Sequence, residues 1–266
     1  MDEENIKNLW DKLLNWYKKE NIHKAVVAFS GGKDSRLVLD SAIKAVEDLK
    51  VIIIDSEVYP RREIEHAKNC ANELGVEYNV VQISILKKEK FRENPPDRCY
   101  HCKVMLFKTI KNSIDKDRVI LEGTNASEIE GHRPGLKAVK DYARAPLLEV
   151  GFGEEEVRDL LRWRKLEVWD RPSFACLASR FPTGMKLTQK KLDRVEKIED
   201  VLFKLGLKQL RVRDFGDNVR IEVWPKDMFK IIDNKGDIIK KVKEEGYDNV
   251  FLDLEGYRTG SISPKD

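Results

Sequence analysis

The sequence predicts an α/β fold, in which a parallel, doubly wound sheet is followed by a smaller α+β domain. Short apolar runs alternate with amphipathic stretches of helical spacing up to about residue 170, which is typical of strands joined by crossover helices. Beyond residue 186 the order changes to a helix, two strands, further helices and a last strand. The stretch between the two patterns has no periodicity and contains prolines and a glycine. We therefore predict domains at 1–170 and 187–266, joined by a linker at 171–186.

The individual elements follow from the spacing of apolar residues. In the N-terminal domain the predicted helices cover residues 4–20, 35–48, 61–74, a segment that begins near Asp97, and 154–161. The predicted strands there cover residues 25–29, 51–55, 76–83 and 119–121, and residues 144–148 read as a short extended piece. In the C-terminal domain we predict a helix at 188–205, strands at 209–214 and 218–224, helical segments over 226–245 and a strand at 250–254.

The first strand is joined to its helix by a turn of small residues. The turn and the start of the helix read Ser30, Gly31, Gly32, Lys33, Asp34 and Ser35. Glycines let the backbone approach a ligand closely, and a helix N-terminus presents N–H groups to an anion. The spacing excludes the Walker A loop and the dinucleotide fingerprint. A carboxylate beside phosphates indicates Mg²⁺, so Asp34 is predicted to hold that ion. Lys33 is expected either near the phosphates or in solvent.

Polar residues also follow two other predicted strands. Asp55, Ser56 and Glu57 end the second strand, and Gly123 and Thr124 follow the fourth. In open α/β sheets ligands bind beyond the carboxyl ends of the strands. We therefore predict that Ser56, Gly123 and Thr124 line the same nucleotide site as the turn.

Three of the four cysteines are arranged as a candidate metal or cluster site. Cys99 and Cys102 form a Cys-x-x-Cys pair at a helix start, and Cys176 lies in the linker. Three thiolates can hold a [4Fe–4S] cluster and leave one iron without a protein ligand. On residues alone, zinc bound with His101 is an equal alternative, and a redox pair or buried thiols are further ones. Cys70 is predicted to be a small buried hydrophobe.

The overall composition does not call for a charged partner. The chain has 266 residues, of which 36% are charged, and a net charge of only +3. Such a surface is mixed and solvated, so bulk charge indicates neither nucleic acid nor a membrane. No apolar stretch reaches the roughly 18–20 residues that a membrane span needs. The acidic start lacks the features of a signal peptide, and we expect a cytoplasmic protein.

Several segments together carry a family resemblance. They are Ser-Gly-Gly-Lys-Asp-Ser at 30–35, Asp-Ser-Glu at 55–57, Gly-Thr-Asn-Ala at 123–126, Arg-Pro-Gly-Leu-Lys at 133–137, Cys-Leu-Ala-Ser-Arg-Phe-Pro at 176–182 and Arg-Val-Arg at 211–213. The first resembles the PP-loop of the ATP pyrophosphatase superfamily. In this order, and over nearly the whole chain, the segments resemble the LarE-type ATP-dependent sulfur transferases.

The resemblance implies a two-step reaction. ATP adenylates a carboxylate of pyridinium-3,5-dicarboxylate mononucleotide, sulfur displaces AMP, and the second carboxylate follows, on the way to the nickel-pincer nucleotide cofactor of lactate racemase. In members with one essential cysteine, the residue matching Cys176 gives up its own sulfur. Cys99 and Cys102 set this sequence apart, and it resembles the three-cysteine members, in which a [4Fe–4S] cluster carries the sulfide. Asp34 and Cys176 are then the predicted catalytic residues.

The resemblance also assigns the substrate site. Ser179, Arg211 and Arg213 match contacts to the substrate phosphate, and Arg180 lies beside the sulfur site. Side chains two apart in a strand point the same way, and guanidinium groups suit phosphate and carboxylate. Glu199 falls on a functional position of the family, although a solvated helix carboxylate is an equal alternative. Because the family forms ring-like hexamers, a homo-oligomer is expected.

Other functions remain open at this point. A tRNA-thiolating enzyme would use the same ATP and cluster chemistry, but it needs a nucleic-acid surface, for which only the basic stretch 87–92 is a candidate. We therefore do not expect a nucleic-acid partner. A non-catalytic ATP-binding protein with structural zinc would gain little from Asp34. An ammonia-dependent ligase would leave the cysteines without a role.

Overall fold

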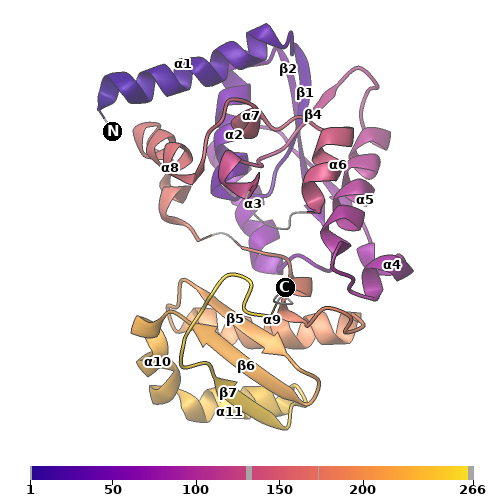
Figure 1. The fold of residues 1–266 in the computed structure, drawn as a ribbon, viewed down its shortest axis with the longest axis vertical. Helices are drawn as coiled ribbons and strands as arrows, with labels where there is room; N and C mark the ends of the chain where they lie inside the picture. Colours follow the sequence, from indigo (N-terminus) through magenta and orange to yellow (C-terminus); the bar gives the residue numbers. More distant parts are fainter. Residues whose placement is uncertain (1, 130–133, 173, 263–266) are drawn as a thin grey trace. The chain divides into compact units, whose positions relative to one another are not determined.

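The computed structural model describes residues 2–129, 134–172 and 174–262. The chain divides into two compact units, which Figure 1 colours in sequence order. Unit 1 comprises Met1–Ile85 and Asp97–Phe174, and unit 2 comprises Leu86–Pro96 and Ala175–Asp266. Of the family segments, part of Arg-Pro-Gly-Leu-Lys lies outside the described residues, because Arg133 is among those left out.

The sheet of unit 1 is parallel throughout. Its strands, in the spatial order β3-β2-β1-β4, are β1 (Lys24–Ala28), β2 (Asp48–Asp55), β3 (Asn79–Gln82) and β4 (Val119–Leu121). Ala25, Val26 and Val27 of the central strand are completely buried. A parallel sheet that is covered on both faces reads as short continuous apolar runs, which is the pattern in this sequence. The predicted α/β fold with a doubly wound parallel sheet is confirmed.

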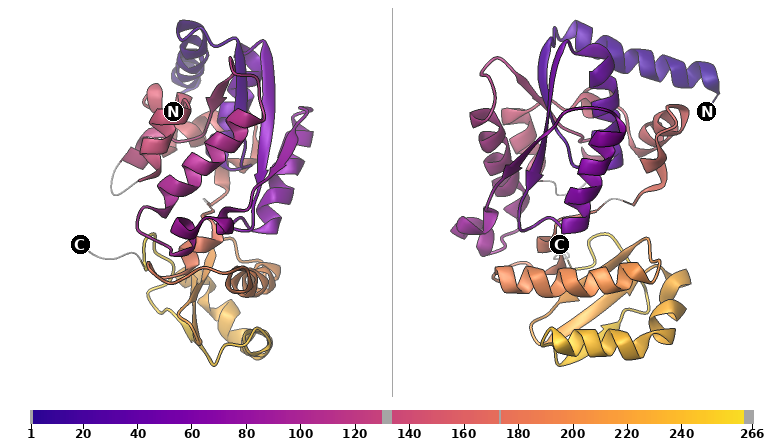
Figure 2. Two further views of the ribbon diagram at one scale, coloured as in Figure 1. Left: turned by 90° about the vertical axis from the view of Figure 1, so that its right-hand side faces the viewer. Right: turned by 180° about the vertical axis from the view of Figure 1, so that it is seen from behind.

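Helices cover both faces of this sheet, as Figures 1 and 2 show. One hydrophobic core joins the strands to α1 (Glu3–Lys19), α2 (Lys33–Ala45), α3 (Arg61–Glu73) and α8 (Glu154–Trp163). On the other face α5 (Arg98–Asn112) packs against α6 (Gly135–Tyr142). Strands and helices therefore alternate so that the loop after β1 and the loop after β4 lie at the same edge of the sheet.

Unit 1 departs from the predicted elements in several places: β3 is shorter than predicted, α6 was not predicted, and two further differences have a local cause. The first helix after the turn ends at Ala45, and β2 begins at Asp48, because the β-branched Val46 already has extended backbone angles. In the predicted extended piece 144–148 only Arg144 bridges to the sheet, and Pro146 begins the short helix α7 (Pro146–Glu149). Proline suits a first helical position because it has no N–H to lose.

Unit 2 is built on a three-stranded sheet of order β5-β6-β7. It contains α4 (Glu89–Arg92), α9 (Gln189–Lys204), β5 (Leu210–Asp214), β6 (Asn218–Val223), α10 (Met228–Asp233), α11 (Lys235–Glu244) and β7 (Asn249–Leu252). β5 and β6 are antiparallel, and β6 and β7 are parallel. Helices α9 and α11 cover one face of the sheet (Figure 2), where Val212 and Ile221 are buried. The smaller α+β arrangement agrees with the predicted fold class.

Residues 86–96 belong to unit 2, although the predicted boundaries placed them in the N-terminal domain. Asn94 is fully buried, and its amide donates to the carbonyl of Pro182 at 2.7 Å. The backbone N–H groups of Gly184 and Leu187 donate to the carbonyls of Asn94 and Arg92. Pairing between segments about ninety positions apart leaves no local pattern in a sequence. The sequence therefore does not predict that residues 86–96 belong to unit 2.

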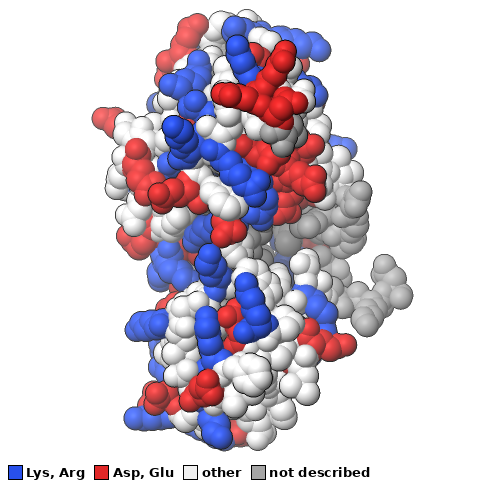
Figure 3. Space-filling model, turned by 90° about the vertical axis from the view of Figure 1, so that its left-hand side faces the viewer, with Lys and Arg blue, Asp and Glu red and all other residues white. Residues whose placement is uncertain are grey.

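The surface of the described chain is mixed in charge. Figure 3 shows acidic and basic side chains interspersed on one face of the molecule. In the described ranges the helices are all too short or too polar to cross a membrane.

Candidate functional site

The turn between β1 and α2 has the geometry of an anion site. Ser30 and Ser35 lie with their hydroxyl oxygens 3.0 Å apart, and the Ser35 hydroxyl donates to the Gly32 carbonyl at 3.0 Å. Helix α2 starts at Lys33, and its N-cap residue Gly32 makes no side-chain capping hydrogen bond in the described structure. Its first N–H groups can therefore bind an anion, together with the positive end of the helix dipole. These residues are brought together as the sequence predicted.

Two glycines are required here by close packing. Gly31 has a left-handed backbone with φ of 72°, and a Cβ on it would lie 2.8 Å from the Cα of Ala67. Gly123, after β4, approaches the start of α2 so closely that a Cβ would lie 2.7 Å from the backbone nitrogen of Ser35. The loops after β1 and β4 thus form one surface, and Gly123 lies beside the turn as predicted.

Replacing Gly123 by alanine is expected to weaken ATP binding at least about tenfold, because the added methyl group would push apart the two loops that form the site. Isothermal titration calorimetry with ATP would measure the loss. Gly236→Ala is a matched control, since a Cβ at that helical position meets nothing within 4 Å. Equal ATP affinity of Gly123→Ala and Gly236→Ala would contradict the assignment of this surface.

Asp34 lies at the centre of a group of polar side chains. Lys33 donates to its two carboxylate oxygens at 2.8 and 3.1 Å, and the amide of Asn125 donates to one of them at 2.7 Å. Lys33 is 4% exposed, so the expectation that its side chain could be solvated is wrong. The single oxygen of the buried Asn125 amide has no hydrogen-bond partner in the described chain. A bound ligand could supply the missing donor.

Lys103 is a residue of this site that the sequence analysis did not single out. Its ammonium donates to the carboxylate of Glu122 at 3.0 Å and to the hydroxyl of Thr124 at 3.2 Å. The backbone N–H of Thr124 also donates to Glu122, at 2.9 Å. Lys103 directly follows the Cys-x-x-Cys pair, and this adjacency is the signal that could have drawn attention to it. It connects the cysteine-bearing helix to the loop after β4.

Ser56 lies buried at the carboxyl end of β2, as predicted, although its partners are protein groups. Its hydroxyl donates to Glu57 at 2.9 Å, and Ser84 donates to the other oxygen of the same carboxylate at 2.9 Å. Ser56 therefore lies at the edge of the sheet where a nucleotide would bind, with Glu57 held in a fixed orientation.

His66 on α3 supports the turn from behind. Its Nε2 lies 3.1 Å from the Gly31 carbonyl oxygen and 3.3 Å from the Cys70 sulfur. Because a carbonyl oxygen can only accept, Nε2 carries the proton in this arrangement. Burial, together with the charge of Arg171, lowers the pKa of His66 from 6.5 to about 4. The ring is therefore neutral at pH 7.

The depressed pKa predicts a pH-dependent stability. The unfolded chain binds the His66 proton more tightly than the folded one, so its contribution is full above pH 6.5 and is lost as the pH falls toward 4. After allowance for partial solvent exposure we expect a loss of about 1–2 kcal/mol in the free energy of unfolding. Urea denaturation at several pH values should show that the free energy of unfolding depends less on pH in His66→Gln than in the wild type. An identical pH dependence of the free energy of unfolding in both proteins would contradict this role of His66.

The cysteines fall into two classes of environment. Cys99 is exposed and Cys102 is half-buried, and both lie in the first turns of α5 at a spacing that places them on one side of the helix. Cys176 precedes the 3₁₀ turn Leu177–Arg180 of unit 2 and is half-buried. Cys70 is buried, as predicted. None of the four forms a disulfide within the described structure.

Soft thiolates within reach of solvent are suitable ligands for iron or zinc, so Cys99 and Cys102 fit the predicted metal or cluster site. No group of three or more His, Cys, Asp or Glu side chains in the described ranges is assembled to hold a metal ion. Cys176 belongs to unit 2, whereas the other two belong to unit 1. Their joint binding of one cluster stays a prediction.

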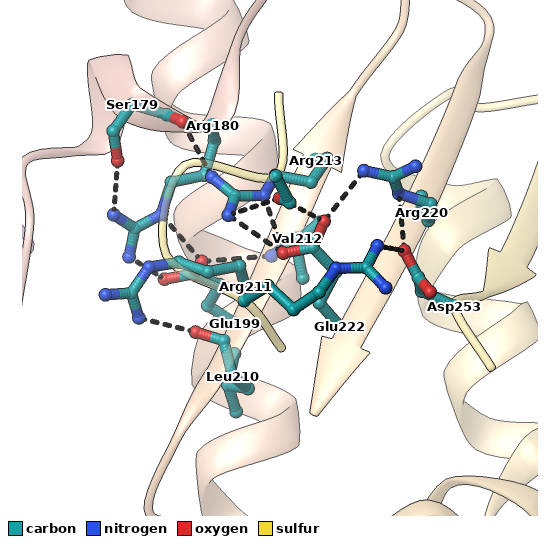
Figure 4. Close-up of polar contacts among 12 residues, drawn as sticks. Ser179, Arg180, Glu199, Leu210, Arg211, Val212, Arg213, Arg220, Glu222 and Asp253 are labelled. Atoms are coloured by element: carbon teal, nitrogen blue, oxygen red, sulfur yellow. Dashed lines mark hydrogen bonds and ion pairs between the residues drawn. The ribbon is translucent and has the colours of Figure 1, made fainter. Parts of the chain in front are cut away.

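The predicted substrate residues come together in unit 2 as a buried polar cluster (Figure 4). Arg213 donates to the Glu222 carboxylate at 2.9 Å and to the Ser179 carbonyl at 2.8 Å. Arg211 is 3% exposed, and its guanidinium lies over the Tyr257 ring. Burial and the nearby Arg180 lower the pKa of Arg211 to about 10, so it is still protonated at neutral pH. Guanidinium groups suit anionic ligands, and in this cluster Arg180 and Arg213 are also paired with the carboxylates of Glu199 and Glu222.

Arg180 and Glu199 form a fully buried ion pair. Two parallel hydrogen bonds of 2.9 and 3.0 Å join them, and both side chains are 0% exposed. Glu199 also accepts from the backbone N–H of Val212 on β5, at 3.1 Å. The alternative of a solvated Glu199 is therefore wrong. Burial alone would lower the pKa of Arg180, but the charge of Glu199 raises it above its usual value.

Arg180 also fixes the segment around Cys176. Its guanidinium donates to the carbonyl oxygens of Ala175 and Cys176, at 2.7 and 3.1 Å, and to the Ser179 hydroxyl at 3.0 Å. The backbone of Ala175 and Cys176 is thus held by the Arg180 side chain, which is itself paired with Glu199. This geometry favours a positioning role for Arg180 over direct contact with a substrate.

Breaking this ion pair is expected to destabilise unit 2. Arg180→Met would leave the Glu199 carboxylate buried without its partner, which costs about 3–5 kcal/mol. Urea denaturation followed by hydrogen exchange would locate the loss in residues 175–262. Arg220→Met is a matched control, because Arg220 is also paired with a buried glutamate but is 28% exposed. Equal stability of Arg180→Met and the wild type would contradict the assigned role of the pair.

The chain is similar in sequence to several known proteins. The family model "Queuosine biosynthesis protein QueC" matches residues 24–92, the part that contains the turn and α2. An uncharacterized protein of Synechocystis sp. is 33% identical over 250 residues, which is 91% of this chain and 92% of the relative. The pyridinium-3,5-bisthiocarboxylic acid mononucleotide synthase of Lactiplantibacillus plantarum is 29% identical over 92% of this chain and 90% of its own. An uncharacterized protein of Methanocaldococcus jannaschii is 29% identical over 96% of this chain and 98% of its own.

Proposed function

Because the chain belongs to the LarE-type family of PP-loop, ATP-using enzymes, we propose that it transfers sulfur to the carboxylates of pyridinium-3,5-dicarboxylate mononucleotide. The observation that carries this proposal is the turn Ser30–Ser35, where uncapped helix N–H groups and the Asp34 carboxylate lie together. The product would be the dithiocarboxylate nucleotide used for a nickel-pincer cofactor of the lactate racemase type.

Unit 1 would activate the substrate with ATP. Ser30, Gly31, Gly32 and Ser35 would bind the phosphates, and Asp34 offers the hard oxygen ligands that Mg²⁺ prefers. A substrate carboxylate attacks the α-phosphorus, the bond to the β-phosphate oxygen breaks, and pyrophosphate leaves. The loop N–H groups stabilise the negative charge that grows on the leaving group. Adenylation is needed because a carboxylate alone is a poor electrophile.

Unit 2 would bind the substrate. We assign the phosphate of the mononucleotide to Ser179, Arg211 and Arg213. Glu222 and the Ser179 carbonyl orient the Arg213 guanidinium, and the Arg211 guanidinium donates to the Leu210 carbonyl. Arg180 would keep the segment around Cys176 in one conformation. Fixed orientation reduces the entropy that is lost when the reacting groups meet.

Cys99, Cys102 and Cys176 would hold a [4Fe–4S] cluster. When bound, such a cluster supplies a sulfide at the iron that has no protein ligand. Attack of sulfur on the acyl adenylate forms the C–S bond and releases AMP. Because the sulfide would be supplied from outside, the enzyme could turn over without consuming Cys176. We also expect a homo-oligomer, which size-exclusion chromatography with light scattering would detect.

The exchange of radiolabelled pyrophosphate into ATP tests the adenylation step. We expect exchange only when pyridinium-3,5-dicarboxylate mononucleotide and Mg²⁺ are both present. Exchange that proceeds equally without the mononucleotide, or no exchange with it, would contradict the proposed substrate.

A further inference from the structure

Lys33 is a buried lysine beside Asp34, the carboxylate that we assign to the metal. It is the first residue of α2, and its side chain is 4% exposed. Its ammonium contacts both oxygens of Asp34, at 2.8 and 3.1 Å. A buried ammonium is costly unless it is paired, so the contact with Asp34 compensates the charge of Lys33.

Lys33 places a positive charge against both oxygens of the Asp34 carboxylate. One oxygen accepts from Lys33 and Asn125, and the other accepts from Lys33. The Asn125 amide can stay in place when a metal binds, because it donates to a single oxygen. The Lys33 ammonium contacts both carboxylate oxygens and would repel a second cation bound there. A divalent cation would therefore bind Asp34 more tightly once Lys33 has moved away.

A second carboxylate lies where Lys33 can move. The nearest oxygen of Glu154, in the first turn of α8, is 4.0 Å from the ammonium. A hydrogen bond from Arg158, together with the charge of Lys33, lowers the pKa of Glu154, so it is ionised at neutral pH. The lysine side chain is long and flexible, and it could pair with Glu154 without leaving its charge uncompensated.

We propose that Lys33 is a positioning residue that takes the place of the divalent cation on Asp34 and is exchanged for it. The inference rests on the proposed function, which assigns Asp34 to the metal. A consequence is that the nucleotide-free enzyme binds metal weakly, and that the cation enters together with ATP, whose phosphates add ligands for it. Lys33 would then turn toward Glu154 or toward the phosphates.

The test is the affinity of the full-length, nucleotide-free protein for Mn²⁺, measured by the loss of the free-ion EPR signal. Lys33→Met keeps the buried stem but removes the competing charge, and we expect Mn²⁺ to bind about tenfold more tightly than in the wild type. Lys33→Arg keeps a cation and should bind Mn²⁺ as weakly as the wild type. Thermal unfolding would confirm that the variants are folded.

Glu154→Gln provides a second test that leaves the buried residues unchanged, because Glu154 is 49% exposed. Without its alternative partner Lys33 should stay on Asp34, and Mn²⁺ binding should weaken about threefold. Equal Mn²⁺ affinity in the wild type, Lys33→Met and Glu154→Gln, with weaker binding only in Asp34→Asn, would overturn the exchange but leave the proposed function intact. Binding that Asp34→Asn does not change would overturn both assignments of Asp34.

Discussion

Replacement of Asp34 by alanine is expected to abolish substrate-dependent pyrophosphate exchange, with a loss of at least about a thousandfold. We propose this carboxylate as the hard oxygen ligand for Mg²⁺ at the turn, and Asn125 and Lys33 donate hydrogen bonds to it. Without it the metal that neutralises the departing pyrophosphate has no anchor on the protein. ATP–pyrophosphate exchange at saturating substrate would measure the effect directly.

Asp115→Ala is the matched control for this loss. Asp115 is an exposed carboxylate of the same unit that pairs with Lys50 and Arg118, and it lies outside the turn. We expect the rate of ATP–pyrophosphate exchange by the Asp115→Ala variant to equal that of the wild type. Substantial exchange by Asp34→Ala would show that the turn does not carry the adenylation chemistry, and iron content would show whether the cysteine site is still intact.

Replacement of Cys102 by serine is expected to remove most of the bound iron and to reduce sulfur transfer to background, while ATP affinity stays unchanged. Serine lacks the soft thiolate that iron prefers. Cys102 is half-buried on α5, and the ATP contacts that we assign lie in other loops. Iron and sulfide analysis of anaerobically prepared protein, combined with ATP calorimetry, would separate the two effects.

Cys70→Ala distinguishes this effect from a general loss of thiols. Cys70 is buried against His66 and is the one cysteine that we do not assign to the cluster. The iron content of the Cys70→Ala variant should match that of the wild type. Equal iron in Cys102→Ser and the wild type would contradict the cluster, and zinc in place of iron would make the Cys-x-x-Cys pair structural. Loss of H₂S from Cys176 after one turnover would favour the sacrificial route instead.

Much of the fold could be predicted because its cause is local. The buried strands β1 and β2 appear in the sequence as apolar runs, and the turn between β1 and α2 appears as small residues at a fixed spacing. The excursion of residues 86–96 into unit 2 could not be predicted, since it depends on Asn94 meeting Pro182 far along the chain.

Charged residues were harder to place than apolar ones. Lys33 and Glu199 lie in highly charged helices, where solvation is the usual outcome, yet both are buried because a partner of opposite charge lies within reach. A signal existed for Glu199, which falls on the same helical stripe as Val195 and Leu202, both buried. No comparable signal exists for Lys33, whose burial depends on packing around the turn.

The central claim is that the chain exchanges carboxylate oxygen for sulfur at the expense of ATP. The most direct test is mass spectrometry of pyridinium-3,5-dicarboxylate mononucleotide after incubation with the anaerobic holoenzyme, ATP, Mg²⁺ and sulfide. We predict the mass change of one sulfur-for-oxygen exchange at each carboxylate, with AMP released in step. An unchanged mononucleotide, or a product that carries ammonia-derived nitrogen in place of sulfur, would contradict the claim.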